Sequence, residues 1–404
     1  MQSSDRFSGG ERAAVVTVAT DDGELEARWN RVVRRRSFLK GMTIAGAAAV
    51  PGSALLASSA AASDGALSDG DAAILRFLAA AELIESDLWG QYTELGGVNV
   101  NGASDGESPG VPTGPFNGSD ASLTPYVSAL RNIDSDMPQY ITDNTDDEFS
   151  HAAFINAYLE AHGREKVDLD EFRRLPSSKA TGAQNKGRLT NLMNLNVDTS
   201  WYTRYRSTSN VDFGGSRPAQ LLVISHQPAI PRDNDDTHDP NRIQAIANTA
   251  AFHFAFIEQG GSSLYTTLLQ QVSSVEVLRI VASIGGTEID HFSLWHDKVS
   301  NALAPPNNVT DPETHLSFPD LSGSTDELKQ TNLILPEPTR FLSPSLPLVS
   351  IIRPSSTANS GAVAAVKAFS DDNLFDGQGP EFFQKLMGLA VAADAARREV
   401  PQNG

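Results

Sequence analysis

The sequence predicts an all-α fold built around a four-helix bundle, and three observations lead to this prediction. Four segments, at about 69–95, 136–161, 240–272 and 274–303, have apolar residues at helical spacing. Each segment carries a glutamate among its apolar residues. In the second and fourth segments a histidine follows that glutamate three positions later. The order along the chain is therefore Glu, Glu-x-x-His, Glu, Glu-x-x-His.

These glutamates and histidines predict one metal centre in the bundle core. Residues three apart on a helix share a face, so each Glu-x-x-His pair can offer a carboxylate and an imidazole to one point. Oxygen and nitrogen ligands of this kind suit Fe or Mn. The alternative is that the glutamates lie on exposed helix faces and the histidines are half-buried structural residues. The predicted ligands of two Fe or Mn ions are Glu82, Glu148, His151, Glu258, Glu288 and His291.

Residues 1–62 predict an export signal with its leader. About thirty polar residues precede the run RRRSFLK at 34–40, and a weakly apolar run with small residues near Ala62 follows. This resembles a twin-arginine (Tat) signal, which implies the Tat translocase as a partner and only transient membrane contact. The protein is then expected at an extracellular, cell-surface or periplasmic location. An uncleaved anchor is the alternative, although the apolar run is short for a spanning helix.

The composition excludes several classes of partner and site. A net charge of −19 argues against binding nucleic acid or an anionic membrane surface. The absence of cysteine excludes disulfides, thiolate metal ligands and cysteine nucleophiles. Lysine is scarce, with eight against twenty-three arginines, and aspartate outnumbers glutamate by thirty-one to nineteen. An acidic, lysine-poor exported chain indicates a halophilic protein, and an ordinary acidic secreted protein is the alternative.

The first helix, from about Asp69 to Leu95, has Asp69 or Asp71 as its expected N-cap and ends at two glycines. Its apolar stripe also holds Glu85 and Trp89. Glu85 can be a further ligand, a group beside the ligands, or a residue at the rim. Residues 96–125 are rich in Gly, Ser, Asn, Pro and Asp and predict a long loop.

The second helix, from about Asp136 to Ala161, places Asp147 next to the ligand pair. Metal-bound histidines commonly donate their other N–H to a carboxylate, and Asp147 is a candidate for this role, with plain solvent exposure as the alternative. Residues 164–241 predict an insertion of short helical and extended pieces. Its aromatic run from Trp201 to Arg206 is expected to pack on the bundle or on another subunit.

The third and fourth helices, Pro240 to Val272 and Ser274 to Leu303, are joined by a short connection and should be antiparallel neighbours. Tyr265 follows Glu258 by two turns. Each helix has a glycine pair, at 260–261 and 285–286, which costs about 1 kcal/mol per glycine in a helix interior. Close helix approach or a local bulge would explain these pairs.

The remaining residues predict a C-terminal extension, 304–404, outside the bundle domain at 63–303. Proline-rich segments are expected to be extended, and one last helix is expected from about Glu381 to Arg398. The extension can pack on the bundle or on another subunit of a homo-oligomer. It carries no residues with evident chemistry.

Residues 70–300 resemble the ferritin-like superfamily, and within it the exported ferritin-like proteins that include plant and bacterial desiccation-related proteins. The motif ELIESDLW at 82–89 is similar to that family's Glu-Tyr-Leu-Glu-Ala-Glu-Phe-Tyr. Glu258 with Gly261 and Tyr265, and GTEIDH at 286–291, match its second half. The resemblance implies the same six metal ligands. Trp89 departs from the usual tyrosine and removes one redox-active phenol.

The resemblance indicates the fold more than the function. Carboxylate and imidazole ligands around two Fe or Mn ions leave open positions for O₂ or peroxide, and so predict an exported oxidoreductase that acts on O₂ or H₂O₂ in stress protection. Manganese-catalase-like and di-iron-oxidase-like activities are both included in this prediction. The alternative is a non-catalytic stress or desiccation-related structural protein on the same bundle. No catalytic residue beyond the metal ligands and no organic cofactor is predicted. The residues expected beside the ligands are Glu85, Trp89, Asp147 and Tyr265.

Overall fold

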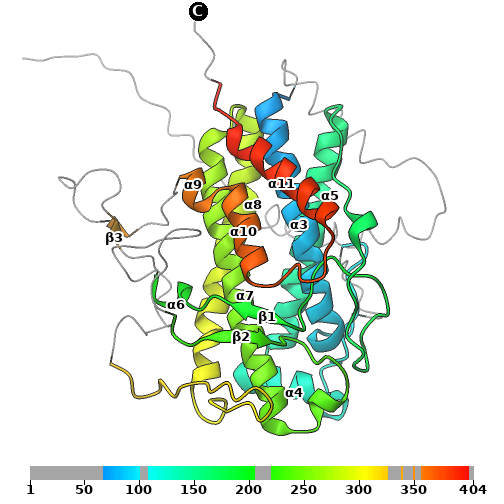
Figure 1. Cartoon of the computed structure of the whole chain (residues 1–404), viewed down its shortest axis with the longest axis vertical. Coiled ribbons are helices and arrows are strands. Elements are labelled where there is room, and N and C mark those ends of the chain that lie inside the picture. Colours follow the sequence, from blue (N-terminus) through cyan, green and yellow to red (C-terminus); the bar gives the residue numbers. More distant parts are fainter. Residues whose placement is uncertain are drawn as a thin grey trace, which may run out of the picture. The chain divides into compact units, whose positions relative to one another are not determined.

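Four long helices form the centre of the protein. The computed structural model describes residues 67–100, 108–204, 220–325, 338–339, 349–350 and 356–399. The helix pair α3 (Asp69–Gly96) and α5 (Met137–Ala161) packs together, as does the pair α7 (Pro240–Leu268) and α8 (Val275–Val299). Figure 1 shows the four helices running along the same axis as one bundle. The predicted all-α four-helix bundle is confirmed.

Polar side chains at the helix starts join the two pairs. The N-cap of α3 is Ser68, whose hydroxyl accepts from the Asp71 N–H at 3.0 Å, so the expected aspartate cap was wrong. The Asp71 carboxylate instead accepts from the backbone N–H groups of Ser273 and Ser274, at 2.8 and 2.9 Å. It therefore fixes the start of α8 against the start of α3.

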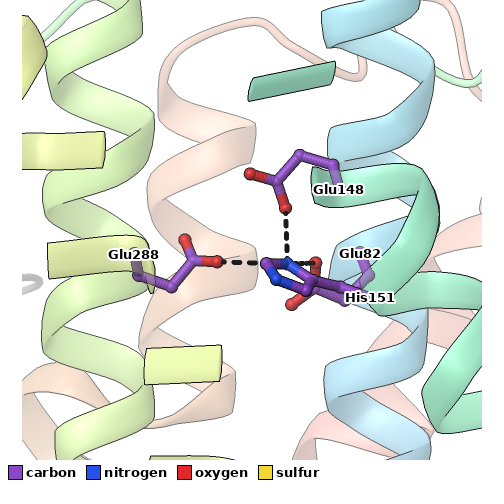
Figure 2. A group of neighbouring side chains, drawn as sticks. All are labelled: Glu82, Glu148, His151 and Glu288. Atoms are coloured by element: carbon purple, nitrogen blue, oxygen red, sulfur yellow. Dashed lines mark hydrogen bonds and ion pairs between the residues drawn. The ribbon is translucent and has the colours of Figure 1, made fainter. Parts of the chain in front are cut away.

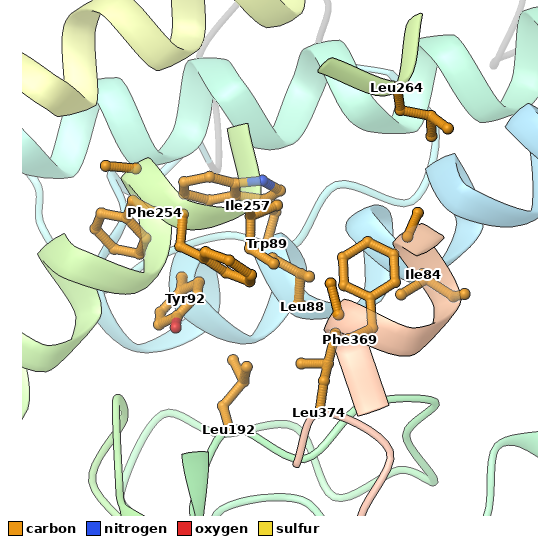
Figure 3. Packing of buried hydrophobic residues seen from close by; sticks show 14 of the residues in the cluster. Ile84, Leu88, Trp89, Tyr92, Leu192, Phe254, Ile257, Leu264, Phe369 and Leu374 are labelled. Carbon is orange, nitrogen blue, oxygen red and sulfur yellow. The ribbon is translucent and has the colours of Figure 1, made fainter. Parts of the chain in front are cut away.

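Aromatic rings fill the space between α3, α7 and α8. Trp89 stacks on Phe254 and on Trp295, with ring centroids 4.8 and 5.5 Å apart. Burying such rings removes large apolar surfaces from water and dominates the energetics of a core. Figure 3 shows that the same cluster includes Leu192 of the insertion and Phe369 and Leu374 of the C-terminal extension.

The insertion between α5 and α7 consists of short pieces, as predicted. Its elements are η2 (Asp170–Phe172), β1 (Leu195–Val197), α6 (Trp201–Arg204), β2 (Ile224–Gln227) and η3 (Asp235–Thr237). β1 and β2 form a two-stranded antiparallel sheet. Trp201 is fully buried, and its ring lies 6.0 Å from Phe252 and 6.2 Å from Phe292. This part of the aromatic run therefore packs on the bundle.

Several helices lie where none was expected. η1 (Asp120–Ser122) ends the predicted loop, and α4 (Pro125–Ile133) follows it with the Thr124 hydroxyl as N-cap and proline in its first turn. The C-terminal extension has α9 (Thr357–Ser360) and α10 (Ala362–Asp371) before α11 (Pro380–Ala395). It also has strands β3 (Pro338–Thr339) and β4 (Val349–Ser350), which pair antiparallel. α11 packs on α3, which places the end of the extension on the bundle.

Two of the bundle helices continue as 3₁₀ turns. η4 (Leu269–Gln271) extends α7, and η5 (Ser300–Leu303) extends α8. The predicted export signal, 1–62, lies outside the described residues, as do 205–219 of the insertion and much of 326–355 in the extension. Of the helices that are described, none combines the length and apolar character that crossing a membrane requires.

Candidate metal centre

The structure brings all six predicted ligands together in the middle of the bundle. The four glutamates are fully buried, at 0% exposure, and His151 and His291 are 8% and 7% exposed. Each helix contributes in the order expected from the sequence: Glu82 from α3, Glu148 and His151 from α5, Glu258 from α7, Glu288 and His291 from α8.

The ligand atoms form two overlapping groups. In the His151 group, atoms of Glu82, Glu148, His151 and Glu288 all lie within 4.8 Å of one another. In the His291 group the same holds for Glu148, Glu258, Glu288 and His291. Glu148 and Glu288 belong to both groups. Because a carboxylate has two oxygens, these two side chains can each serve two neighbouring cations.

The distances within the groups are short and similar. His151 Nδ1 lies 3.3 Å from Glu82 Oε2, 3.1 Å from Glu148 Oε2 and 3.6 Å from Glu288 Oε1 (Figure 2). His291 Nδ1 lies 3.2 Å from Glu148 Oε1 and 3.3 Å from Glu258 Oε2. The two oxygens of Glu148 therefore face different imidazoles, as expected of a carboxylate between two sites.

Two serines show that the halves of the centre are built alike. The Ser86 hydroxyl donates to the carbonyls of Glu82 and Glu148, at 2.7 and 3.2 Å. The Ser262 hydroxyl donates to the carbonyls of Glu258 and Glu288, at 2.9 and 3.2 Å. Each serine follows the single glutamate of its half by four residues and joins it to the Glu-x-x-His helix. This Glu-x-x-x-Ser repeat was a signal that the sequence reading missed.

Three neighbouring side chains contact the ligands directly. Asp147 Oδ2 lies 3.0 Å from His291 Nε2, so Asp147 serves the histidine of the facing helix and not that of its own. The Tyr265 hydroxyl donates to Glu82 Oε1. Asn144, which the sequence reading missed, donates to Glu148 Oε1 at 2.8 Å and to Glu258 Oε1 at 3.1 Å.

A second contact fixes the orientation of Asn144. Its Oδ1 accepts from the Trp295 indole N–H at 2.7 Å, which leaves the amide N–H₂ directed at the carboxylates. Asn144 lies one helical turn before Glu148, so the spacing could have indicated it. No spacing rule links Trp295 to it, because that contact crosses from α8 to α5.

Glu85 and Trp89 lie near the ligands without joining either group. Burial and the charges of Glu288 and Glu148 raise the pKa of Glu85 well above its usual value. Trp89 contributes its ring to the aromatic core, and its indole nitrogen has no hydrogen-bond partner among the described residues. Of the open alternatives for Glu85, a buried group beside the ligands agrees best with this position.

Close approach, and not a bulge, explains one glycine of each pair, Gly261 and Gly285, because α7 and α8 are continuous α-helices. A Cβ built on Gly261 would lie 2.2 Å from Glu288 Oε2 and 3.0 Å from its Cδ. A Cβ on Gly285 would lie 2.8 Å from the Tyr265 Cβ. Gly261 therefore makes the space that the Glu288 carboxylate occupies.

Without a cation, the buried carboxylates compete for protons. Burial raises the pKa of Glu82 to about 7, against the charge of His151. Burial and the charge of Glu148 raise the pKa of Glu288 well above its usual value. For Glu148, burial opposes ionisation, but hydrogen bonds from His151 and His291 outweigh it and lower its pKa. Burial also opposes charge on His151, but Glu82 and Glu148 raise its pKa to about 11.

Buried carboxylate oxygens that accept no hydrogen bond from the described residues indicate that a metal fits this centre. Glu82 Oε2 and both carboxylate oxygens of Glu288 are buried and have no hydrogen-bond partner among the described residues. Such oxygens are costly unless a proton or a cation meets them. The available donors are carboxylate oxygens and imidazole nitrogens, a set that suits Fe and Mn. The residues thus fit the metals expected from the sequence.

We expect the metal-free protein to lose stability as the pH rises from about 5 to about 8, by roughly 2 kcal/mol or more. Folded Glu82 binds its proton up to about pH 7, whereas its usual pKa is 4.5, so the folded state holds more protons across this interval. The raised pKa of His151 acts in the same direction above about pH 6.5. Urea unfolding with chelator at both pH values measures the effect.

The metal-loaded protein is the control for this experiment. Its surface charges are the same, but cations take the place of the protons, so its stability should depend less on pH. An equal loss of stability with and without metal would contradict the expectation.

Comparison with known proteins gives one match. No curated protein and no solved structure matches the chain. Residues 70–301 match the family of ferritin-like domains, and this range is more than half of the 404 residues and includes nearly all of the four bundle helices. The match agrees with a bundle whose core holds glutamates and histidines that could bind a metal. The chain belongs to the ferritin-like domain family.

Proposed function

We propose that the bundle binds two Fe or Mn ions and acts as an oxidoreductase on O₂ or H₂O₂. One observation carries the proposal: Glu148 and Glu288 belong to both groups of ligand atoms, so two ions bound there would be neighbours. Bound Fe or Mn supplies the change of oxidation state that reduction of O₂ or peroxide requires.

The surrounding side chains would orient the ligands and hold protons. Asn144 fixes the carboxylates of Glu148 and Glu258 relative to each other across two helices. Asp147 engages Nε2 of His291, which leaves Nδ1 for the centre. The Tyr265 hydroxyl keeps a proton at Glu82 Oε1. The Asp147 side chain is 48% exposed, so small molecules would approach from the side of His291.

A non-catalytic scaffold is the second candidate function. The observation that favours it is the complete burial of the four glutamates, which leaves little open surface at the centre. In this role, as in a stress or desiccation-related structural protein, the metal would stabilise the bundle by neutralising buried carboxylates.

Metal content and turnover on the purified chain distinguish these functions. Fe-loaded and Mn-loaded protein would be analysed for metal by mass spectrometry, and O₂ release from H₂O₂ and O₂ uptake with a reductant would be followed. Two ions with turnover support the oxidoreductase, and two ions without turnover support the scaffold. Protein that binds neither metal would contradict both functions.

We also propose that the protein is exported by the Tat translocase and acts outside the cytoplasmic membrane. The run RRRSFLK at 34–40 supports this. Changing Arg35 and Arg36 together to Lys should trap the protein inside the cell, as measured by fractionation. The change Arg34→Lys, outside the arginine pair, is the matched control and should be exported normally. Normal export of the double variant would rule out this route.

A further inference from the structure

A pocket lies on the outer side of α3 and α5, under the insertion. Its volume is about 240 Å³. Its floor is apolar and comes from both helices, with Leu83 and Gly90 of α3 and Phe149 and Ala152 of α5. The insertion closes one side with three basic side chains, Arg173, Lys186 and Arg188. This is an unusual concentration of positive charge in a chain of net charge −19.

The two arginines of this pocket are neutralised by aspartates and a glutamate. Arg173 lies 2.6 Å from Asp87 Oδ1 and 2.8 Å from Asp170 Oδ1. Arg188 is buried and pairs with the carboxylate of Glu94. These contacts hold the insertion against α3, and they leave neither guanidinium as an uncompensated charge.

Lys186 is different, because its ammonium group forms no ion pair and no hydrogen bond within the described part of the chain. Lys186 is exposed and lines the edge of the pocket. Desolvation at the pocket and the charge of Arg188 lower the pKa of Lys186, and the charges of Glu94 and Asp87 oppose this in part. A negative group placed beside the ammonium would offset both effects. The pocket therefore presents, beside an apolar floor, one ammonium group that has no ion-pair partner among the described residues.

We propose that this pocket binds a small organic monocarboxylate with an aromatic or short aliphatic body. The carboxylate would pair with Lys186, and the body would lie on Phe149 and Leu83. A single ammonium group without an ion-pair partner matches a single negative charge, and the nearby carboxylates of Asp87 and Glu94 disfavour a multiply charged anion such as phosphate. None of the six predicted metal ligands lines the pocket, although Ser86 does, and the proposal goes beyond the proposed function.

The size of the pocket agrees with this class of ligand. Ligand sites usually occupy about 300–1,000 Å³, so 240 Å³ suits a molecule of benzoate or hexanoate size. A second cavity of about 300 Å³ adjoins the pocket and shares Leu83, Ala153, Asn156 and Arg173 with it. It offers room for a longer aliphatic chain.

Calorimetric titration of the full chain with sodium benzoate and sodium hexanoate tests the proposal. We expect both to bind, and benzamide and inorganic phosphate to bind at least tenfold more weakly. The change Lys186→Gln should weaken benzoate binding at least tenfold, because it removes a charged partner. The matched control Lys179→Gln removes an exposed lysine of the same insertion outside the pocket and should bind as the parent does.

A second variant keeps the test decisive if Lys186→Gln folds poorly. Ala153 is exposed at the helix surface and lines the pocket, so Ala153→Trp should fill the pocket, abolish benzoate binding and leave the fold intact. The proposal is wrong if the parent binds neither carboxylate, if benzamide binds as tightly as benzoate, or if Ala153→Trp binds benzoate like the parent. Metal-free and metal-loaded protein should give the same result.

Discussion

Replacing Glu288 with Gln should abolish metal binding and yet make the metal-free protein more stable. Both carboxylate oxygens of Glu288 are buried without a hydrogen-bond partner among the described residues. Burial and the charges of neighbouring glutamates raise its pKa well above its usual value. Folding at neutral pH must therefore protonate it or bury its charge. An amide of the same shape removes that cost, but it could not neutralise or hold cations as the carboxylate of Glu288 would.

Replacing Glu148 with Gln should also abolish metal binding, but it should make the metal-free protein less stable by about 3 kcal/mol. Glu148 faces His151 and His291 with one oxygen each, at 3.1 and 3.2 Å, and it accepts from Asn144. Its pKa is lowered because the histidines outweigh burial. Removing this charge leaves two buried cationic imidazoles with weaker partners.

Metal analysis and urea unfolding after chelation measure both effects. Glu85→Gln is the control, because Glu85 is also buried beside the ligands and belongs to neither group of ligand atoms. It should keep most of its Fe or Mn. If the Glu148 and Glu288 variants bind metal as the parent does, the assignment of both residues as shared ligands is wrong. Equal stability changes in the two variants would contradict the different electrostatic roles.

Replacing Gly261 with Ala should weaken metal binding at least tenfold and change stability little. The added Cβ would lie 2.2 Å from Glu288 Oε2, so the carboxylate must move away. The group that moves is the end of a flexible side chain, and the helix gains about 0.5–1 kcal/mol of propensity from the alanine. The substitution therefore weakens metal binding and leaves the stability of the fold nearly unchanged.

Gly286→Ala is the matched control for Gly261→Ala. Gly286 is also inside a bundle helix near the centre, but a Cβ built there meets no heavy atom within 4 Å. This variant should keep its metal and become slightly more stable. Dissociation constants for Mn and urea midpoints of both variants give the comparison. Full metal affinity in Gly261→Ala would show that the Glu288 carboxylate can bind from another position.

The sequence by itself determined the four helices and the six residues that meet between them. Helical spacing is a local property, so it already places Glu148 and His151 on one face, as it does Glu288 and His291. The cost of an unpaired buried carboxylate then predicts that such faces turn towards a common cation. Because helical spacing is local, the sequence also shows the apolar stripes of the long helices without any tertiary information.

Short helices were harder to predict from the sequence than the four long ones. α4 has nine residues and α10 has ten, and helices of this length are marginal alone. Their stability comes from tertiary packing: α4 packs on α7, and α10 packs mainly on α11 and α9 and also on α7. Local signals such as Thr124 before a proline were present in the sequence. They lead to a stable helix only when the segment also packs on the rest of the protein.

Only the tertiary structure decided which groups complete the centre. Asp147 serves His291 and not His151, Trp295 orients Asn144, and Gly261 admits the Glu288 carboxylate. Each of these contacts joins two helices, so it depends on how far one helix is shifted along the other and on how closely they approach. Side-chain spacing within one helix contains no information on that shift, because packing of the complete core sets it.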